Sequence, residues 1–236
     1  LNYDDIIQKC LRSHVTGFKP GNSPRVFDQS LLLRAISNNY TTHCHLHGSL
    51  KWGFPTSVNP FEIHEHDTPS EGVRASFSRP SGRPSQRGDT LPVLPIVTGM
   101  DKTELVFRNP FYSNFLAFFR SLELSTHLLI VGYGFSDRHV NLGIQQCREN
   151  RPRVKTYIVD FAQYNDPSYY LDKLTPDSWR TILPGDPFHA ERLSSFDGWW
   201  KLPEFNQGGV YANSLFMWLK GFDAFCEEFC NRGLPE

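Results

Sequence analysis

The fold is decided by an apolar run that ends in a glycine-rich turn: His127-Leu128-Leu129-Ile130-Val131 followed by Gly132-Tyr133-Gly134-Phe135-Ser136-Asp137. A run without polar alternation is typical of a central parallel strand that is buried on both faces. Small residues follow this strand, and Asp137 is suited to cap a helix that we expect over residues 137–149. The next strand is expected over residues 154–160, an apolar stretch that ends on Asp160.

Helical and extended patterns alternate on the N-terminal side of this unit. We expect helices over residues 4–13, 29–37 and 110–124, and the phenylalanines of the last recur at the spacing of a packed helix face. A strand is expected over residues 41–47, and a short strand or a turn over residues 50–52. This alternation predicts an α/β domain with a mainly parallel sheet flanked by helices.

Two regions differ from that pattern. Residues 53–90 are rich in proline, serine and glycine, which predicts an irregular insertion. Residues 210–230 are strongly apolar and predict a C-terminal helix that packs on the domain or on a second subunit. We therefore expect one main domain over residues 1–200 and a helical appendage over residues 201–236.

Charge and cysteine usage narrow the class of protein. Lys and Arg total 24 against 25 for Asp and Glu, so there is no overall positive field to attract nucleic acid. Four arginines between Arg74 and Arg87 indicate a solvated loop first and a phosphate-contacting strip second. Five scattered cysteines fit a reducing cytoplasm, and no apolar run reaches the roughly 18 residues that cross a bilayer. We expect a soluble cytoplasmic protein.

Polar and glycine residues follow the two strongest predicted strands, where open α/β sheets bind their ligands. The backbone N–H groups of Gly132 to Gly134 can meet an anionic or ribose-bearing ligand, and Asp160 can accept hydrogen bonds from a ribose. Structural alternatives remain open, because glycines also serve tight turns and Asp160 can be a simple loop acid.

A histidine stands before a glycine in His45-Leu46-His47-Gly48-Ser49-Leu50-Lys51-Trp52. His47 is expected at a solvent-reachable strand end, where it can act as a general base near neutral pH. His43, His45 and His47 share one face of the expected strand, but a helper carboxylate is not evident, so a metal site is not favoured. Asn2 and Asp4 flank Tyr3 and either face one pocket or cap the first helix.

Together these motifs resemble the sirtuin superfamily, and most closely the Sir2-like domains of bacterial antiphage defence proteins. Asn2-Tyr3-Asp4 resembles the family's Asn-x-Asp segment, Leu46-His47-Gly48-Ser49 its catalytic His-Gly, and Gly132 to Asp137 the Gly-Tyr-Ser-Phe-Ser-Asp form of the defence branch. The resemblance covers roughly residues 1–160 and implies a Rossmann-like sheet. It also implies that residues 1–200 form an NAD-binding domain.

The resemblance implies a role for each candidate residue. His47 is the base at the nicotinamide ribose, Asn2 orders ribose or water, and Asp4 holds the carboxamide. The ribose and phosphate side is lined by Gly132, Tyr133, Gly134 and Ser136, with Asp160 near the adenosine ribose.

Two departures from the family affect the expected activity. The Gly-Ala-Gly-x-Ser phosphate loop that precedes Asn-x-Asp in the family does not occur in this chain, and we expect either residues upstream or another segment to supply it. Residues 53–90 contain no cysteine, whereas deacylating sirtuins carry a four-cysteine zinc module there, so we expect no zinc. The first hypothesis is an NAD glycohydrolase in antiphage defence that assembles with itself or with another defence subunit.

Three other functions are weighed against it. The alternative is a module that senses NAD or ADP-ribose without hydrolysis. A nuclease-linked subunit and an NAD-dependent protein deacylase rank below both.

Overall fold

The computed structural model describes residues 11, 13–53, 62–68, 73–76, 90–93, 107–151, 153–162, 165–167, 191–193, 198–203 and 214–235. The chain forms two compact units, residues 1–121 and residues 122–236. The expected first helix and the candidates Asn2 and Asp4 lie outside the described residues.

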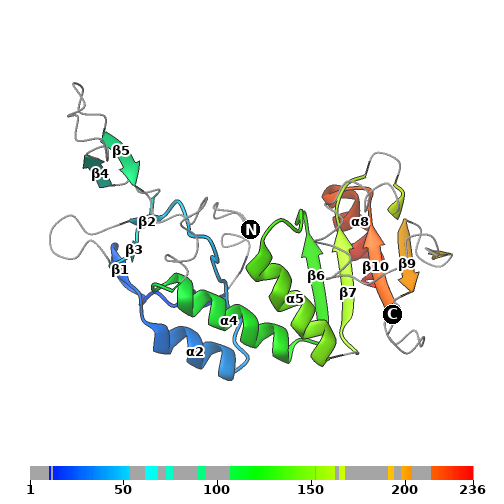
Figure 1. Ribbon diagram of the computed structural model, residues 1–236, viewed down its shortest axis with the longest axis horizontal. Coiled ribbons are helices and arrows are strands. Elements are labelled where there is room, and N and C mark those ends of the chain that lie inside the picture. Colours follow the sequence, from blue (N-terminus) through cyan, green and yellow to red (C-terminus); the bar gives the residue numbers. More distant parts are fainter. Residues whose placement is uncertain are drawn as a thin grey trace. The chain divides into compact units, whose positions relative to one another are not determined.

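The second unit is built on a five-stranded sheet with the order β6-β7-β10-β9-β8 (Figure 1). Strands β6 (His127–Val131), β7 (Lys155–Val159) and β10 (Ser214–Trp218) are parallel. Strands β9 (Trp199–Pro203) and β8 (Glu191–Arg192) continue the sheet in antiparallel pairing. The sheet is therefore mixed and Rossmann-like on its parallel side, where the predicted order of strand, helix and strand is confirmed.

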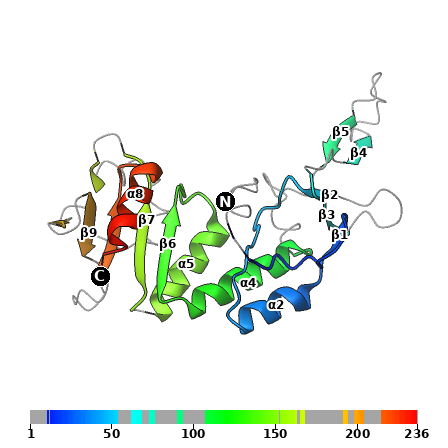
Figure 2. The ribbon, with the colours of Figure 1, turned by 180° about the vertical axis from the view of Figure 1, so that it is seen from behind.

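Two helices cover opposite faces of this sheet, α5 (Arg138–Asn150) on one and α8 (Phe222–Arg232) on the other (Figures 1 and 2). Aromatic side chains make the core under α8, where Phe225 packs with Tyr157, Trp199 and Trp218. The Tyr157 hydroxyl also donates to the backbone oxygen of Pro235 at 2.8 Å, which ties the segment after α8 to the sheet. The expected C-terminal helix is present.

That helix is shorter than expected, because residues 214–218 form strand β10. The prediction of a helix from about residue 210 is wrong there. Leu215, Phe216, Met217 and Trp218 are all buried, and a residue run buried on both sides suits a strand between two neighbours as well as a helix. The length of the apolar run did not distinguish a strand from a helix.

The burial expected for residues 127–131 is also wrong. Strand β6 ends the described sheet and pairs with β7 alone, and Leu129 and Val131 are 43% and 41% exposed. Ile130, which points to the opposite face, is buried. The strands buried on both faces are β7 and β10.

The first unit packs two helices, α2 (Gln29–Ser37) and α4 (Phe111–Leu124), whose last residues pass into the second unit. Both predicted helices are confirmed. Leu32 and Ile36 of α2 pack on Ala117 of α4, and Phe111 packs with Phe18, Trp52 and Ile63 in a neighbouring cluster. Asp28 caps α2 by accepting from the Ser30 backbone N–H.

Short strands complete the first unit. Strands β1 (Arg25–Val26), β3 (His64–Glu65) and β2 (Trp52–Gly53) form a small antiparallel sheet, and β4 (Val73–Ser76) pairs with β5 (Thr90–Val93). The insertion over residues 53–90 thus holds short strands rather than irregular chain alone. The strand expected over residues 41–47 is reduced to one parallel bridge between Thr42 and Val15.

Among the helices that the structure describes, none combines the length and the apolar character needed to cross a membrane. The domain division at residue 200 stays a prediction.

Candidate functional site

The described candidates fall into two groups. His47 belongs to the first unit, whereas Gly132, Tyr133, Gly134, Ser136 and Asp160 belong to the second. The second group follows the carboxyl ends of β6 and β7, which are neighbouring parallel strands. Gly132 N donates to Val159 O at 2.9 Å, so the glycine turn and Asp160 start at adjacent points of the sheet.

The turn from Gly132 to Asp137, here called the glycine loop, alternates between solvent and protein. Gly132, Gly134 and Ser136 are exposed, whereas Phe135 and Asp137 are buried and Tyr133 is half-buried. Phe135 keeps a left-handed backbone with φ of 52° while its ring is fully buried. Every second residue therefore anchors the loop and the others form its outer surface.

Gly134 has neither of the usual structural reasons to be a glycine. Its φ lies outside the positive range, and a Cβ built on it meets no described atom within 4 Å. Gly132 also faces open space, but its φ of 57° disfavours a side chain. A glycine that neither backbone nor neighbours require leaves bare backbone for close approach by a ligand.

A hydrogen-bond network from α5 holds the glycine loop. The Tyr133 hydroxyl donates to Asn141 Oδ1 at 2.6 Å and lies 3.1 Å from the Asp137 backbone oxygen. Asn141 Nδ2 donates to Phe135 O at 2.8 Å. Asp137 Oδ1 accepts from the backbone N–H groups of His139 and Val140, so the predicted helix cap is confirmed.

Because the Tyr133 hydroxyl serves this network, we expect Tyr133→Phe to destabilise the protein by about 1 kcal/mol, the usual net value of one hydrogen bond. The buried Asn141 amide oxygen loses its donor in this variant. Urea unfolding followed by fluorescence measures the change. The matched control is Tyr112→Phe, at an exposed tyrosine of α4. Equal stability of the two variants contradicts the anchoring role.

Asp160 is half-exposed directly after β7. Its Oδ1 accepts from the Phe161 backbone N–H at 2.8 Å, and its backbone oxygen accepts from Gly221 N at 3.0 Å. The local bond to Phe161 is what a loop acid makes, and a carboxylate can accept more than one hydrogen bond. Both interpretations of Asp160 thus fit this geometry.

His47 is buried, with 8% of its surface exposed, and the expectation of a solvent-reachable histidine is wrong. Its ring centroid lies 6.3 Å from that of Phe115, a residue of α4 distant in sequence. Gly48, which follows it, has a φ of 100° and turns the chain sharply. The His47 ring therefore lies within the packed part of the first unit.

The other histidines of this segment belong to an aromatic row. The ring centroids of His43 and His45 are 4.4 Å apart, and the ring centroid of His45 lies 5.7 Å from that of Trp52. Within the described part of the chain, no three His, Cys, Asp or Glu side chains are grouped to hold a metal ion. Burial raises the pKa of the Cys44 thiol to about 12, so Cys44 is not a nucleophile near neutral pH.

Burial lowers the pKa of His43 below its ordinary value of 6.5, and the nearby His14 adds to this shift. Since the unfolded chain then binds a proton first, stability should fall as the pH drops from 6.5 through the folded-state pKa. We expect His43→Asn to lose less stability than the wild type between pH 7 and pH 5. Urea unfolding at both values measures this. The control is His127→Asn, at an exposed histidine. If His43→Asn and this control lose the same stability between pH 7 and pH 5, His43 is not the source of the pH dependence.

Fold and site define an α/β protein with a mixed sheet that is Rossmann-like on its parallel side, and with a bare, anchored loop at its strand ends. A family model for the SIR2-like domain matches residues 1–180 of the 236, and the chain therefore belongs to the SIR2-like family. SIR2-like domains use NAD, and the resemblance to sirtuins is confirmed at this level. No curated protein matches the chain.

Sequence reasoning missed Asn141, which fixes the glycine loop. Its position four residues after the cap Asp137 was the available signal, because residues four apart share one helix face. Asparagine is common on solvated helix faces, and only the structure shows that Asn141 is buried against Phe135.

Proposed function

We propose that this chain is an NAD glycohydrolase that cleaves NAD to nicotinamide and ADP-ribose. The observation that carries the proposal is the bare backbone at Gly134, beside exposed Gly132 and Ser136, in a chain of the SIR2-like family. Such a loop suits the ribose and phosphate part of a dinucleotide, which approaches backbone closely.

The reaction breaks the bond between nicotinamide and ribose, and water supplies the new oxygen and releases one proton. In this proposal His47 accepts a proton at the ribose, Asn2 orders the ribose or the water, and Asp4 binds the carboxamide. Bond cleavage passes through an oxocarbenium-like state, which a site closed to bulk water favours.

The second group of residues binds rather than reacts. Gly132, Gly134 and Ser136 line the ribose and phosphates, Tyr133 lines the loop's inner side and fixes its shape, and Asp160 accepts from the adenosine ribose. NAD is the substrate, and no zinc is needed. Deacylation is less favoured, because residues 53–90 contain no cysteine.

The second candidate function is a sensor that binds NAD or ADP-ribose and leaves it intact. The burial of His47 favours it, since a buried base reaches its substrate less readily than an exposed one. Calorimetry with NAD beside chromatography of the products separates the two functions. Binding with intact NAD after long incubation identifies the sensor, and release of nicotinamide identifies the hydrolase.

We also propose that the enzyme acts in antiphage defence, as a homo-oligomer or together with another defence subunit. The support is the Gly132 to Asp137 motif and the exposed aromatic rings of Phe222 and Phe229 on α8, which a partner can cover. Cellular NAD during phage infection tests this role. NAD should fall in cells with the wild-type chain and persist in cells with His47→Asn.

A further inference from the structure

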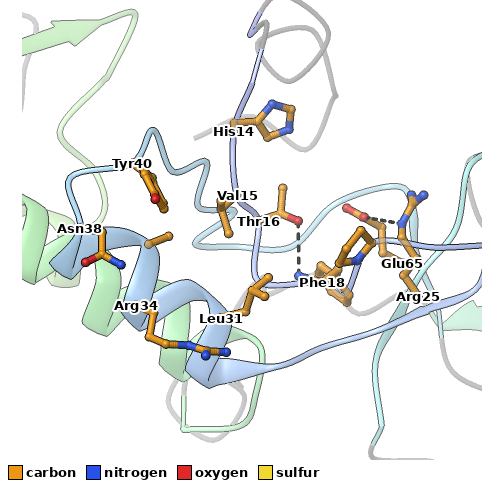
Figure 3. Close-up of a pocket in the computed structure, with 12 residues that line it drawn as sticks. His14, Val15, Thr16, Phe18, Arg25, Leu31, Arg34, Asn38, Tyr40 and Glu65 are labelled. Carbon is orange, nitrogen blue, oxygen red and sulfur yellow. Dashed lines mark hydrogen bonds and ion pairs between the residues drawn. The ribbon is translucent and has the colours of Figure 1, made fainter.

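A pocket lies in the first unit, and none of the candidate residues of the NAD site is among the residues that line it. Its volume is about 640 Å³, within the range of small-molecule sites. The floor is apolar and includes Phe18, Leu31 and Ala35. The rim is polar and includes Arg34, Asn38 and Tyr40, of which Tyr40 is 64% exposed (Figure 3).

Arg34 is an uncompensated cation at this rim. Its Nε donates to Ser30 O at 3.1 Å, and its Nη2 lies 3.5 Å from Ser30 Oγ. Ser30 Oγ in turn donates to Asp28 Oδ1 at 2.7 Å, so the helix cap also positions the arginine. Among the described residues Arg34 forms no ion pair. A preorganised guanidinium without an acidic partner suits a phosphate.

The opposite end of the pocket offers an acceptor. Glu65 is 3% exposed, and its Oε2 accepts from Arg25 Nε at 3.0 Å (Figure 3). Arg25 also binds Asp67 at 2.8 Å, so its charge is compensated. Glu65 Oε1 is buried without a hydrogen-bond partner, which is costly for a carboxylate. A ligand N–H group at this end supplies the missing donor.

We propose that this pocket binds a nucleoside monophosphate, with the phosphate on Arg34, the flat base over the apolar floor and an N–H group of the base at Glu65. The three features follow one another along the pocket: the cation, the apolar floor and the buried acceptor (Figure 3). The exposed Tyr40 ring adds a face for stacking at the rim. None of its lining residues is among those proposed for NAD.

Calorimetry of the full chain tests the proposal with AMP, GMP, adenosine, purine riboside 5′-monophosphate and inorganic phosphate. We expect AMP or GMP to bind more tightly than adenosine or inorganic phosphate, by roughly tenfold or more. Adenosine lacks the phosphate that binds Arg34, and inorganic phosphate lacks the base that binds the floor and Glu65. Purine riboside monophosphate lacks the exocyclic amine and should also bind more weakly. Equal affinity for adenosine, for phosphate or for the amine-free analogue overturns the proposal, as does absence of binding.

Variants assign the binding to this pocket. Arg34→Gln should weaken nucleotide binding by roughly 10- to 100-fold, the range for a charged hydrogen bond, and the exposed control Arg153→Gln should not change it. Gly134→Val should also leave AMP binding intact. Full binding by Arg34→Gln, or displacement of AMP by NAD, overturns the proposal without bearing on NAD cleavage.

Discussion

Gly134→Val should abolish NAD binding while the protein stays folded. The glycine loop leaves open space at Gly134, and its φ permits a side chain, so the substitution should change the free energy of unfolding by less than about 0.5 kcal/mol. A branched side chain there covers the backbone that we propose the ribose and phosphates approach. Calorimetry with NAD measures the binding, and urea unfolding measures the stability.

Gly132→Ala is the matched comparison for this prediction. The positive φ of Gly132 strains any other residue, by about 1 kcal/mol or more. Gly132→Ala should therefore lose both stability and NAD binding, whereas Gly134→Val loses binding alone. If Gly134→Val binds NAD as the wild type does, the glycine loop does not line the NAD site.

His47→Asn should lower NAD cleavage by roughly 10²- to 10⁴-fold, the usual contribution of a general base. Asparagine keeps much of the polar volume but does not accept a proton near neutral pH. NAD affinity should change little, because we propose that other residues form the binding surface. Nicotinamide release under saturating NAD measures the rate, and calorimetry measures the affinity.

His43→Asn is the control for this substitution, since it makes the same change in the same segment. His43 is only half-buried and belongs to the aromatic row with His14 and His45. At pH 7.5 we expect its activity to stay near that of the wild type. Equal loss in both variants indicates that the segment, rather than the base, was disturbed.

The second unit shows how far local pattern predicts structure. The run from His127 to Val131, the cap Asp137 and the helix after it are all confirmed, because strand ending, capping and helical period are local properties. The alternation of the glycine loop is also local, since polar and small residues face solvent and Phe135 faces the core.

Burial and strand pairing that depend on residues distant in the sequence could not be predicted. His47 is buried by packing near Phe115 of α4, and β6 is exposed because its place in the sheet leaves it one described neighbour. Residues Ser214–Trp218 form a strand because they pair in parallel with β7. This pairing cannot be predicted from the helical period of the local sequence. Arg25 and Glu65, which are 40 residues apart in the sequence, are joined by a hydrogen bond in the pocket of the first unit.

The products formed from NAD test the central proposal most directly. The full chain is incubated with NAD, without any acyl-lysine peptide, and the mixture is quenched over time and separated by chromatography. Nicotinamide and ADP-ribose should appear in equal amounts with the wild type and should be nearly absent with His47→Asn at matched NAD occupancy. NAD that stays intact with the wild type, or products formed equally by both proteins, would contradict the proposal.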